Sequence, residues 1–496
     1  MARSTFSSTT SLAFALRRSH QWSLCKFYLV LSIPCPLLST NIYFLMMKFV
    51  DELPLYDQSN RHQSSGWKRL DVHARRVRIL YMEPLHIVIS PNIYLRIRAT
   101  RDAPLLPGLK KIHIPNIPSL DLSSALFLAS GSTLSMIQLD SNAAISDREF
   151  FVPFLSLLYI KSPGLSHLAL RGDVPSASVE PIYRFTELQS LELRFCNPHS
   201  HPRLLLHLHK LGRLPRLLNL IIDAGDLIVN FIERHSTNPI PISNPKFRQL
   251  RRLQILGTTT SIECILDELK GLTNLSALKI DEVWNGGSGI SFSSWRSSFE
   301  AISTFSAVED IEITLPPGRY ILSTSSLAPL FRLVNLKSFV INFNLAFSGS
   351  DDDFRLLAGS FPKLKKFVVP GPPSRGFGRT LACLYYLSRE CPDLREIKIA
   401  VSSNISDNLN AIKKLPHPIV RNYQHPLEKL YIDSDFGQLQ PIQLVQVAQF
   451  LDLIFPNLSI LETDNSKMTE AANWTGIHEL RFALQNARIN PSSSDI

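Results

Sequence analysis

The chain is poor in cysteine and has no paired cysteine motif. Its 496 residues contain six cysteines, and no two of them form a C-x-x-C pair. Structural zinc sites use closely spaced cysteine pairs, and extracellular repeat proteins usually carry a paired disulfide framework. These six cysteines show neither. We therefore expect an intracellular protein, cytoplasmic or nuclear. Four Asn-x-Ser/Thr sequons are present, but two of them, at Asn274 and Asn457, directly precede a repeated leucine, and we expect no glycosylation there.

Sequence signatures of catalysis are also missing. The chain has no G-x-S-x-G, no H-E-x-x-H and no phosphate-binding P-loop. Four histidines lie between 199 and 209, but His207 and His209 are two residues apart on an expected helix, about 200° around its axis, and cannot converge on one ion. We expect no enzyme activity, no cofactor, no metal and no small-molecule substrate.

One run of 21 residues is uncharged and mostly apolar, long enough to be considered as a membrane span. It extends from Phe27 to Met47 and contains Pro34 and Pro36 near its middle. Proline removes helical hydrogen bonds that cannot be replaced in lipid, so a membrane span is the less favoured interpretation. A membrane-anchored protein stays open as an alternative.

What the sequence does contain is a repeat. The stretch from Leu188 to Cys196 reads L-x-x-L-x-L-x-x-C, which is typical of the strand of a leucine-rich repeat. Similar hexapeptides recur along the chain, and the twelve intervals between them measure 23 to 33 residues. Their first residues are Leu109, Leu134, Leu165, Leu188, Leu217, Leu250, Leu275, Val308, Leu336, Leu364, Leu394, Leu427 and Leu458.

A repeat of this period predicts an α/β fold. We expect a leucine-rich-repeat solenoid in the form of an open horseshoe, with about 13 parallel strands on the concave face and helices on the convex face. Segments with helical periodicity lie between the strands, at 203–211, 226–234, 351–358 and 442–455, and 474–487 reads as a terminal helix. Units of 23 or 25 residues are expected to carry a turn or a 3₁₀ segment instead of a full helix.

The repeat positions divide the chain into four regions. We expect a poorly defined segment at 1–50, a helical cap at 51–105, the repeat array at 106–466, and a cap helix with a tail at 467–496. From the cap into the first repeat, residues 61–111 hold 11 Lys or Arg against 3 Asp or Glu. Trp67, Leu70, Ala74 and Val77 share one helical face, so a solvated basic face is favoured. A nucleic-acid-associated protein using this basic region is the alternative.

Two blocks of sequence resemble a known family. Residues 67–80, W-K-R-L-D-V-H-A-R-R-V-R-I-L, and the following P-L-L-P at 104–107 are similar to the leucine-rich-repeat F-box proteins of mushroom-forming fungi. In that family an F-box docks a Skp-type adaptor and, through it, a cullin ubiquitin ligase, and the repeats recognise substrates. The resemblance implies the substrate-recognition part of such an adaptor. Residues 1–50 contain no F-box signature, so by comparison with this family they are expected to be either disordered or a degenerate or missing F-box region.

Candidate binding residues follow from the alternation within each strand. The residue between the second and third apolar positions of the hexapeptide points away from the core, toward the concave face. Mixed charges at this position favour a protein partner over a polyanion. The candidates are His113, Gln138, Glu192, Gln254, Lys279, Glu312, Lys398 and Tyr431.

Overall fold

The computed structural model describes most of the repeat array. The described residues are 27–30, 71–72, 74–82, 104–114, 133–140, 148–172, 174, 179–194, 204–225, 247–283, 294–316, 321–342, 346–369, 379–416, 425–434, 436–463 and 468–489. The helix expected at 226–234 lies outside the described residues, as do Trp67 and Leu70.

One large sheet runs through the described part of the chain. It has 15 strands, and from β2 onward its neighbours are parallel and follow chain order. Antiparallel β1 precedes them, which leaves 14 parallel strands. The strands are β1 (Phe27–Val30), β2 (Ile79–Met82), β3 (Lys111–Ile114), β4 (Met136–Leu139), β5 (His167–Leu170), β6 (Ser190–Arg194), β7 (Asn219–Asp223), β8 (Arg252–Gly257), β9 (Ala277–Glu282), β10 (Asp310–Thr314), β12 (Ser338–Asn342), β14 (Lys366–Val369), β15 (Glu396–Ala400), β16 (Lys429–Asp433) and β17 (Ile460–Glu462).

The start of the sheet differs from the sequence-based expectation. We expected Val77 to lie on a helical face, but the helical turn around Ala74 ends before Val77, and strand β2 follows directly. Leu80 of β2 is buried against Ile112 of the first predicted strand, which explains the additional parallel strand. β1 pairs with the outer edge of β2, within the segment 1–50 that was expected to be disordered or a degenerate or missing F-box region. An added strand of this kind covers an otherwise open sheet edge.

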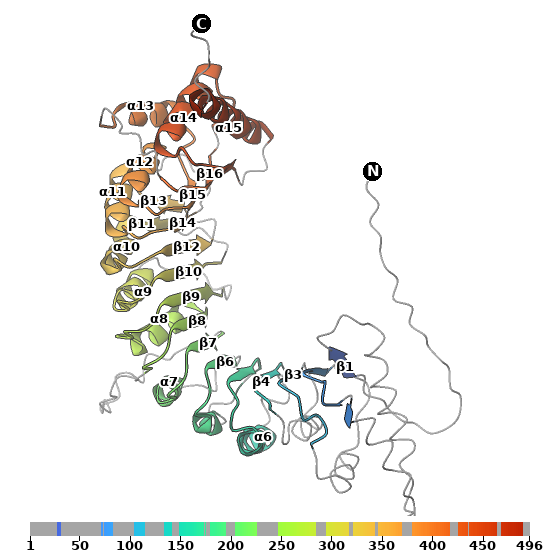
Figure 1. Cartoon of the computed structure of the whole chain (residues 1–496). Helices are drawn as coiled ribbons and strands as arrows, with labels where there is room; N and C mark the ends of the chain where they lie inside the picture. The colour runs from blue at the N-terminus through green and yellow to red at the C-terminus, as the bar shows by residue number, and fades with distance from the viewer. Residues whose placement is uncertain are drawn as a thin grey trace, which may run out of the picture.

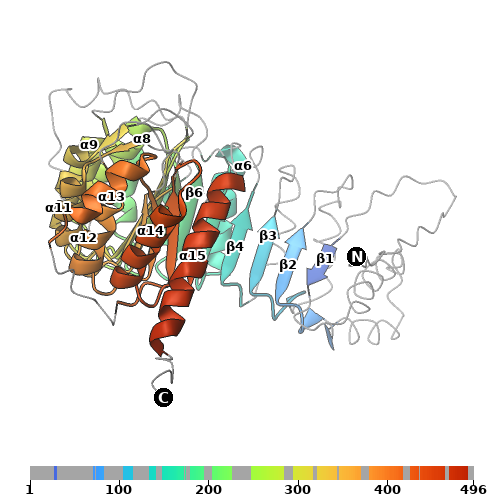
Figure 2. The same cartoon turned by 90° about the horizontal axis from the view of Figure 1, so that it is seen from above.

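The helices cover one side of the sheet. Figure 1 shows them on the outer side of the bend, with the strands on the inner side, so the solenoid is an open horseshoe with a concave sheet. Figure 2, seen from above, shows the helices as a layer separate from the strands. They are α6 (Arg148–Lys161), η3 (Glu180–Arg184), α7 (Leu204–Leu211), α8 (Thr259–Glu268), α9 (Ser294–Ile302), α10 (Thr324–Leu327), η5 (Ala328–Arg332), α11 (Asp351–Ser360), α12 (Ala382–Glu390), α13 (Ile405–Lys413), α14 (Pro441–Ile454) and α15 (Met468–Ile489).

The length of a repeat unit predicts only in part which kind of helix the unit carries on the convex side. The 23-residue unit that begins at Leu165 carries the 3₁₀ helix η3, as expected. The 25-residue unit that begins at Leu250, in contrast, holds the ten-residue α8. This helix fits because Thr258 directly follows β8 and caps α8, its side chain accepting a hydrogen bond from the amide of Ser261. The expectation of a turn in that unit is therefore wrong.

A small second sheet lies apart from the main one. β11 (Ile321–Ser323) and β13 (Ala346–Ser348) form a parallel pair, and each leads into a helix whose N-cap is a serine. Ser350 caps α11 reciprocally, because its hydroxyl accepts from the amide of Asp353 while the Asp353 carboxylate accepts from the amide of Ser350.

The core lies between the sheet and the helices. The repeated Leu or Val of each unit and the second and third apolar positions of its hexapeptide are buried in one continuous cluster, except in the last unit, where the half-buried Thr463 takes the third position. Aromatic rings fill the wider space in the units around β12 and β14, where Phe339 stacks on Phe367 and Phe354 meets Phe367 edge-on. The leucine pattern therefore defines a single elongated core without separate globular domains in the described array.

Helix α15 covers the C-terminal end of this core. It packs on α14 and β17, and Trp474 is fully enclosed, with its indole N–H donating to the Ser434 hydroxyl at 3.2 Å. The guanidinium of Arg481 is buried and donates to the carbonyl of Leu458, which begins the last strand unit. The helix expected at 474–487 lies within α15.

Candidate functional site: the concave face of the sheet

The concave face is built from alternate residues of the strands. In most strands the residues between the buried apolar ones are half-buried or exposed, although Ala169 of β5 and Val368 of β14 are buried, and no helix among the described residues covers them. Because the parallel strands pair without a register shift, the middle residue of one strand lies beside the middle residue of the next. We call this line of side chains the central row.

All eight sequence-predicted residues lie in the central row. His113 lies beside Gln138, and Lys398 lies beside Tyr431. Gln254, Lys279 and Glu312 are consecutive members, whereas Glu192 is separated from the others by apolar neighbours on both sides. The complete row is Tyr81, His113, Gln138, Ala169, Glu192, Ile221, Gln254, Lys279, Glu312, Val340, Val368, Lys398, Tyr431 and Glu462.

Hydrogen bonds between strands tie the N-terminal part of the face together. The His113 ring contacts the Asp140 carboxylate at 2.7 Å, and the Gln138 amide also donates to that carboxylate at 3.0 Å. Arg171 donates twice to the carboxylate of Glu192, at 2.5 and 3.0 Å, and this hydrogen bonding raises the pKa of Arg171. A bidentate guanidinium–carboxylate pair holds both side chains in one geometry.

A second network lies at the centre of the face. The Gln254 amide donates to Asp281 at 2.8 Å. The Lys279 ammonium donates to the Glu312 carboxylate at 2.9 Å, which raises the pKa of Lys279, and the Asn342 amide donates to the same oxygen of Glu312 at 3.3 Å. Lys279 and Glu312 therefore use much of their hydrogen-bonding capacity within the face. They hold one another's side chains in place and leave little unpaired charge to attract an ion.

Two apolar breaks interrupt the polar networks. Ile221 of β7 forms the first break, with Leu256 of β8 diagonally beside it on the same face, and the half-buried Val340 of β12 forms the second together with the buried Val368 of β14. The breaks are separated by β9 and β10, so at a strand spacing of about 4.8 Å they lie roughly 14 Å apart. Sequence reasoning missed them because it selected polar residues, although the same repeat position identifies Ile221, Val340 and Val368; Leu256 lies two residues further along its strand. Apolar side chains in a polar surround are common anchors of protein interfaces.

The concave face carries almost no net charge. Across the central row and the residues two positions to either side, the described residues include eight basic and nine acidic side chains. The basic ones are Lys111, Arg171, Arg194, Arg252, Lys279, Lys366, Lys398 and Lys429, and the acidic ones are Asp140, Glu192, Asp223, Asp281, Asp310, Glu312, Glu396, Asp433 and Glu462. The net charge of +10 of the whole chain is therefore located elsewhere. A phosphate backbone is attracted by an excess of cations, which this face does not offer.

The cysteine thiols of the described residues lie in the core, away from this face. Cys264, Cys383 and Cys391 are buried thiols. Burial raises the pKa of Cys391 to about 12 and that of Cys383 well above its usual range, which disfavours the nucleophilic thiolate. No group of three metal-ligating side chains occurs among the residues that the structure describes.

The sequon asparagines are engaged in the fold. The Asn274 amide donates to the Arg248 carbonyl at 2.6 Å, and the Asn457 amide donates to the His425 carbonyl at 3.1 Å. Asn404 caps α13, and Asn473 is buried with its carbonyl accepting from the amide of Leu439. Glycan attachment at Asn473 is incompatible with this packing.

Within the described part of the chain, no helix combines the length and the apolar character that crossing a bilayer requires.

The strand order, the parallel register and the buried leucine positions define the chain as a leucine-rich-repeat solenoid of the α/β type. No family model matches the chain, and no curated protein matches it. Among solved structures, the chain is similar to an internalin from Listeria monocytogenes, with 12% sequence identity and a TM-score of 0.39 over 76% of this chain and 96% of that one.

Proposed function

We propose that the chain is a non-enzymatic interaction protein that binds a protein partner on the concave face. The observation that carries this proposal is the uncovered, charge-balanced central row with its two apolar breaks. A rigid sheet presents these side chains at fixed spacing, so binding does not require the surface to become ordered. The mixed polar and apolar surface suits a folded protein better than a polyanion or a small molecule.

A finer proposal follows from the resemblance of residues 67–80 and 104–107 to fungal F-box repeat proteins. The chain would then be the intracellular substrate-recognition part of a ubiquitin-ligase adaptor, with the concave face as the substrate site. Residues 1–50 hold no F-box signature, so we predict that this chain by itself binds a Skp-type adaptor weakly or not at all.

Calorimetry with a purified Skp-type adaptor tests the finer proposal. We expect no heat of binding at micromolar concentrations. A stoichiometric complex with a micromolar or lower dissociation constant would show that the N-terminal segment docks the adaptor, and would contradict that prediction.

Affinity purification with quantitative mass spectrometry tests the concave face itself. The informative variant is Val340→Glu, which places a charge in the second apolar break without altering the core side of β12. Ile442→Ser is the matched control, because Ile442 is exposed on α14 of the convex layer. We expect partners recovered with the parent and with the control to be at least tenfold depleted with Val340→Glu.

A further inference from the structure

Five exposed arginines lie close together where the successive strands β7 and β8 begin. Two lie in the turn before β7, two in the turn before β8, and one is the first residue of β8. A backbone hydrogen bond of 2.8 Å joins the second turn to the first. Parallel strands begin at the same edge of a sheet, with backbones about 4.8 Å apart, so the five side chains share one edge of the solenoid. We call this set the arginine edge; it comprises Arg213, Arg216, Arg248, Arg251 and Arg252.

Little negative charge balances the arginine edge. The described residues from 204 to 222 and from 247 to 256, which form both turns and most of both strands, contain no Asp or Glu. Arg216 pairs with Glu187 of the preceding unit. The other arginines of the two turns, Arg213, Arg248 and Arg251, form no ion pair with another described residue. The edge therefore carries uncompensated positive charge and accounts for part of the net charge of +10 of the chain.

The dipole of helix α7 explains only part of this arrangement. Positive side chains are stabilised near the C-terminal end of a helix, and the effect falls off within the last turn. Helix α7 ends at Leu211, so Lys210 and Arg213 lie close to this end. Arg216 lies five residues beyond it, and Arg252 belongs to a strand. Stabilisation of a helix end therefore leaves these two arginines unexplained.

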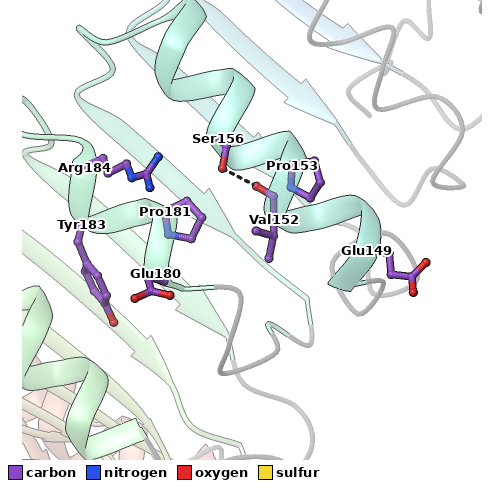
Figure 3. A pocket seen from close by; sticks show the side chains of 8 residues that line it. All are labelled: Glu149, Val152, Pro153, Ser156, Glu180, Pro181, Tyr183 and Arg184. Carbon is purple, nitrogen blue, oxygen red and sulfur yellow. Dashed lines mark hydrogen bonds between the residues drawn. The ribbon is translucent and has the colours of Figure 1, made fainter.

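The excess of positive charge does not continue onto the neighbouring convex surface. Figure 3 shows the groove between α6 and η3, where the Arg184 side chain turns across the groove and the Glu149 carboxylate points away from η3. Glu180 of η3 faces Lys210 of α7, with 4.0 Å between the charged groups. The charges on that side have both signs, so the arginine edge is a local feature of the surface.

The surroundings of the arginine edge favour phosphate groups as its ligands. Neither turn exposes a large apolar side chain, so a lipid surface or a folded protein finds no apolar anchor there. Of the nearby aromatic rings, Phe247 is buried, and the Lys210 ammonium lies over the ring of Tyr183. Single-stranded nucleic acids are bound largely by stacking their bases on exposed rings, which this edge does not offer. Guanidinium groups, in contrast, donate two parallel hydrogen bonds to a phosphate.

We propose that the arginine edge binds the phosphate backbone of duplex nucleic acid without reading its sequence. A duplex carries one negative charge per about 1.7 Å of its axis, so several phosphates come within reach of one short edge. Binding releases the counterions condensed on these phosphates and is therefore strongest at low salt. The proposal does not depend on the partner of the concave face, because the arginine edge and the central row use different side chains.

Fluorescence anisotropy with the full chain tests the proposal. The probe is a fluorescein-labelled DNA duplex of about 20 base pairs, roughly 70 Å long. It is compared with a second duplex of scrambled sequence, with duplex RNA and with one DNA strand alone, and phosphatidylserine vesicles serve as competitor. We expect the two DNA duplexes to bind equally and at least fivefold more tightly than the single strand, and the vesicles not to compete.

The comparison decides between the possible ligands. Tighter binding of the DNA or of the RNA duplex would show which duplex is the ligand and would support the proposal. Absence of duplex binding at low salt would overturn it. Equal or tighter binding of the single strand, or displacement of the probe by the vesicles, would also overturn it.

Matched variants locate the binding. Arg213→Gln with Arg216→Gln, and Arg248→Gln with Arg251→Gln, each remove two charges from exposed positions where unfolding is not expected. Each pair should weaken duplex binding at least tenfold. The slope of the logarithm of the binding constant against the logarithm of the salt concentration should become shallower by about two, because two phosphate contacts are lost. Unchanged affinity and slope in both pairs would refute the assignment.

Three controls separate the arginine edge from other effects. Lys413→Gln with Lys414→Gln removes two exposed charges at the end of α13 and should leave duplex binding unchanged. Arg248→Lys with Arg251→Lys keeps the charge and should bind within threefold of the parent. Val340→Glu on the concave face should also bind like the parent. A tenfold loss in the lysine control or in Val340→Glu would show that the duplex binds elsewhere, and the proposal would be wrong.

Discussion

At the scale of single residues, one position of a strand must be apolar while the next position accepts a charged side chain. Leu191 of β6 is 0% exposed and packs under the helices, whereas Glu192 is half-buried on the concave face and pairs with Arg171. The backbone of a strand sends consecutive side chains to opposite faces. A charge is therefore tolerated at one position and strongly destabilising at the next.

Leu191→Asp is predicted to unfold the protein. Burying an unpaired carboxylate costs several kcal/mol, which is a large share of the stability of a typical domain. Circular dichroism and thermal melting measure the effect, with Glu192→Ala as the control that should melt like the parent. A Leu191→Asp variant with the parent's transition would show that the assigned register is wrong.

His425 makes stability depend on pH. Its ring is 1% exposed beside Phe455 and accepts a hydrogen bond from the amide of Leu427, and burial lowers its pKa to about 4. The unfolded chain binds a proton near pH 6.5, whereas the folded chain does so only near pH 4. Its contribution to stability is thus complete above pH 6.5 and is lost as the pH falls toward 4.

We expect the parent to lose about 3 kcal/mol through this group between pH 7 and pH 4, since each unit of pKa difference corresponds to about 1.4 kcal/mol. Urea unfolding at several pH values measures the loss, and His425→Gln isolates it from the carboxylates that titrate in the same range. A difference between parent and variant that does not change with pH would contradict the assignment.

At the scale of elements, each helix must close off the core beneath it. The convex helices in the middle of the array have neighbours on both sides, but α15 is the last described element and covers the end of the solenoid. Trp474 fills the space between α15 and the segment after β16, where it packs against Phe436. A terminal unit without such a cap leaves apolar surface in water.

Trp474→Ala should destabilise the protein by about 3 to 5 kcal/mol, because a large buried side chain is replaced by a cavity. Phe482→Ala on the exposed face of the same helix is the control and should cost much less. Denaturant unfolding followed by far-ultraviolet circular dichroism provides both values. Equal effects of the two substitutions would mean that α15 does not cap the core as described.

The success of sequence reasoning differs between elements for physical reasons. The apolar hexapeptides predict the strands, because a strand buried on one face requires apolar residues at alternate positions. β2 was missed because Val77 and Leu80 also fit a helical spacing, and the three-residue strands β11 and β13 are too short for any pattern. On the concave face, the central row followed from the motif. Its ion pairs did not, because they depend on which side chains meet across neighbouring strands, and its apolar breaks were missed because only polar residues were selected.

At the scale of the whole molecule, stability is distributed along the solenoid. Each unit contacts mainly its neighbours, so a change at one end acts locally. β1 pairs with the free edge of β2 and is the element farthest from the C-terminal cap.

A chain that begins at Leu53 lacks β1 and leaves the edge of β2 open. We expect faster amide exchange in β2 and β3, and unchanged exchange in the strands from β8 to β16, because the effect decays across neighbouring units. Hydrogen–deuterium exchange with mass spectrometry compares the two chains strand by strand. Uniformly faster exchange across the array would contradict nearest-neighbour stability.

The central claim is that the concave face is the surface with which the chain binds its protein partner. The most direct measurement compares the partners recovered by parallel affinity purification of the parent, of Val340→Glu and of Ile442→Ser, after all three have been shown to melt alike. The account predicts that Val340→Glu loses the specific partners at least tenfold while Ile442→Ser keeps them. Recovery of the same partners at the same level with Val340→Glu would contradict it.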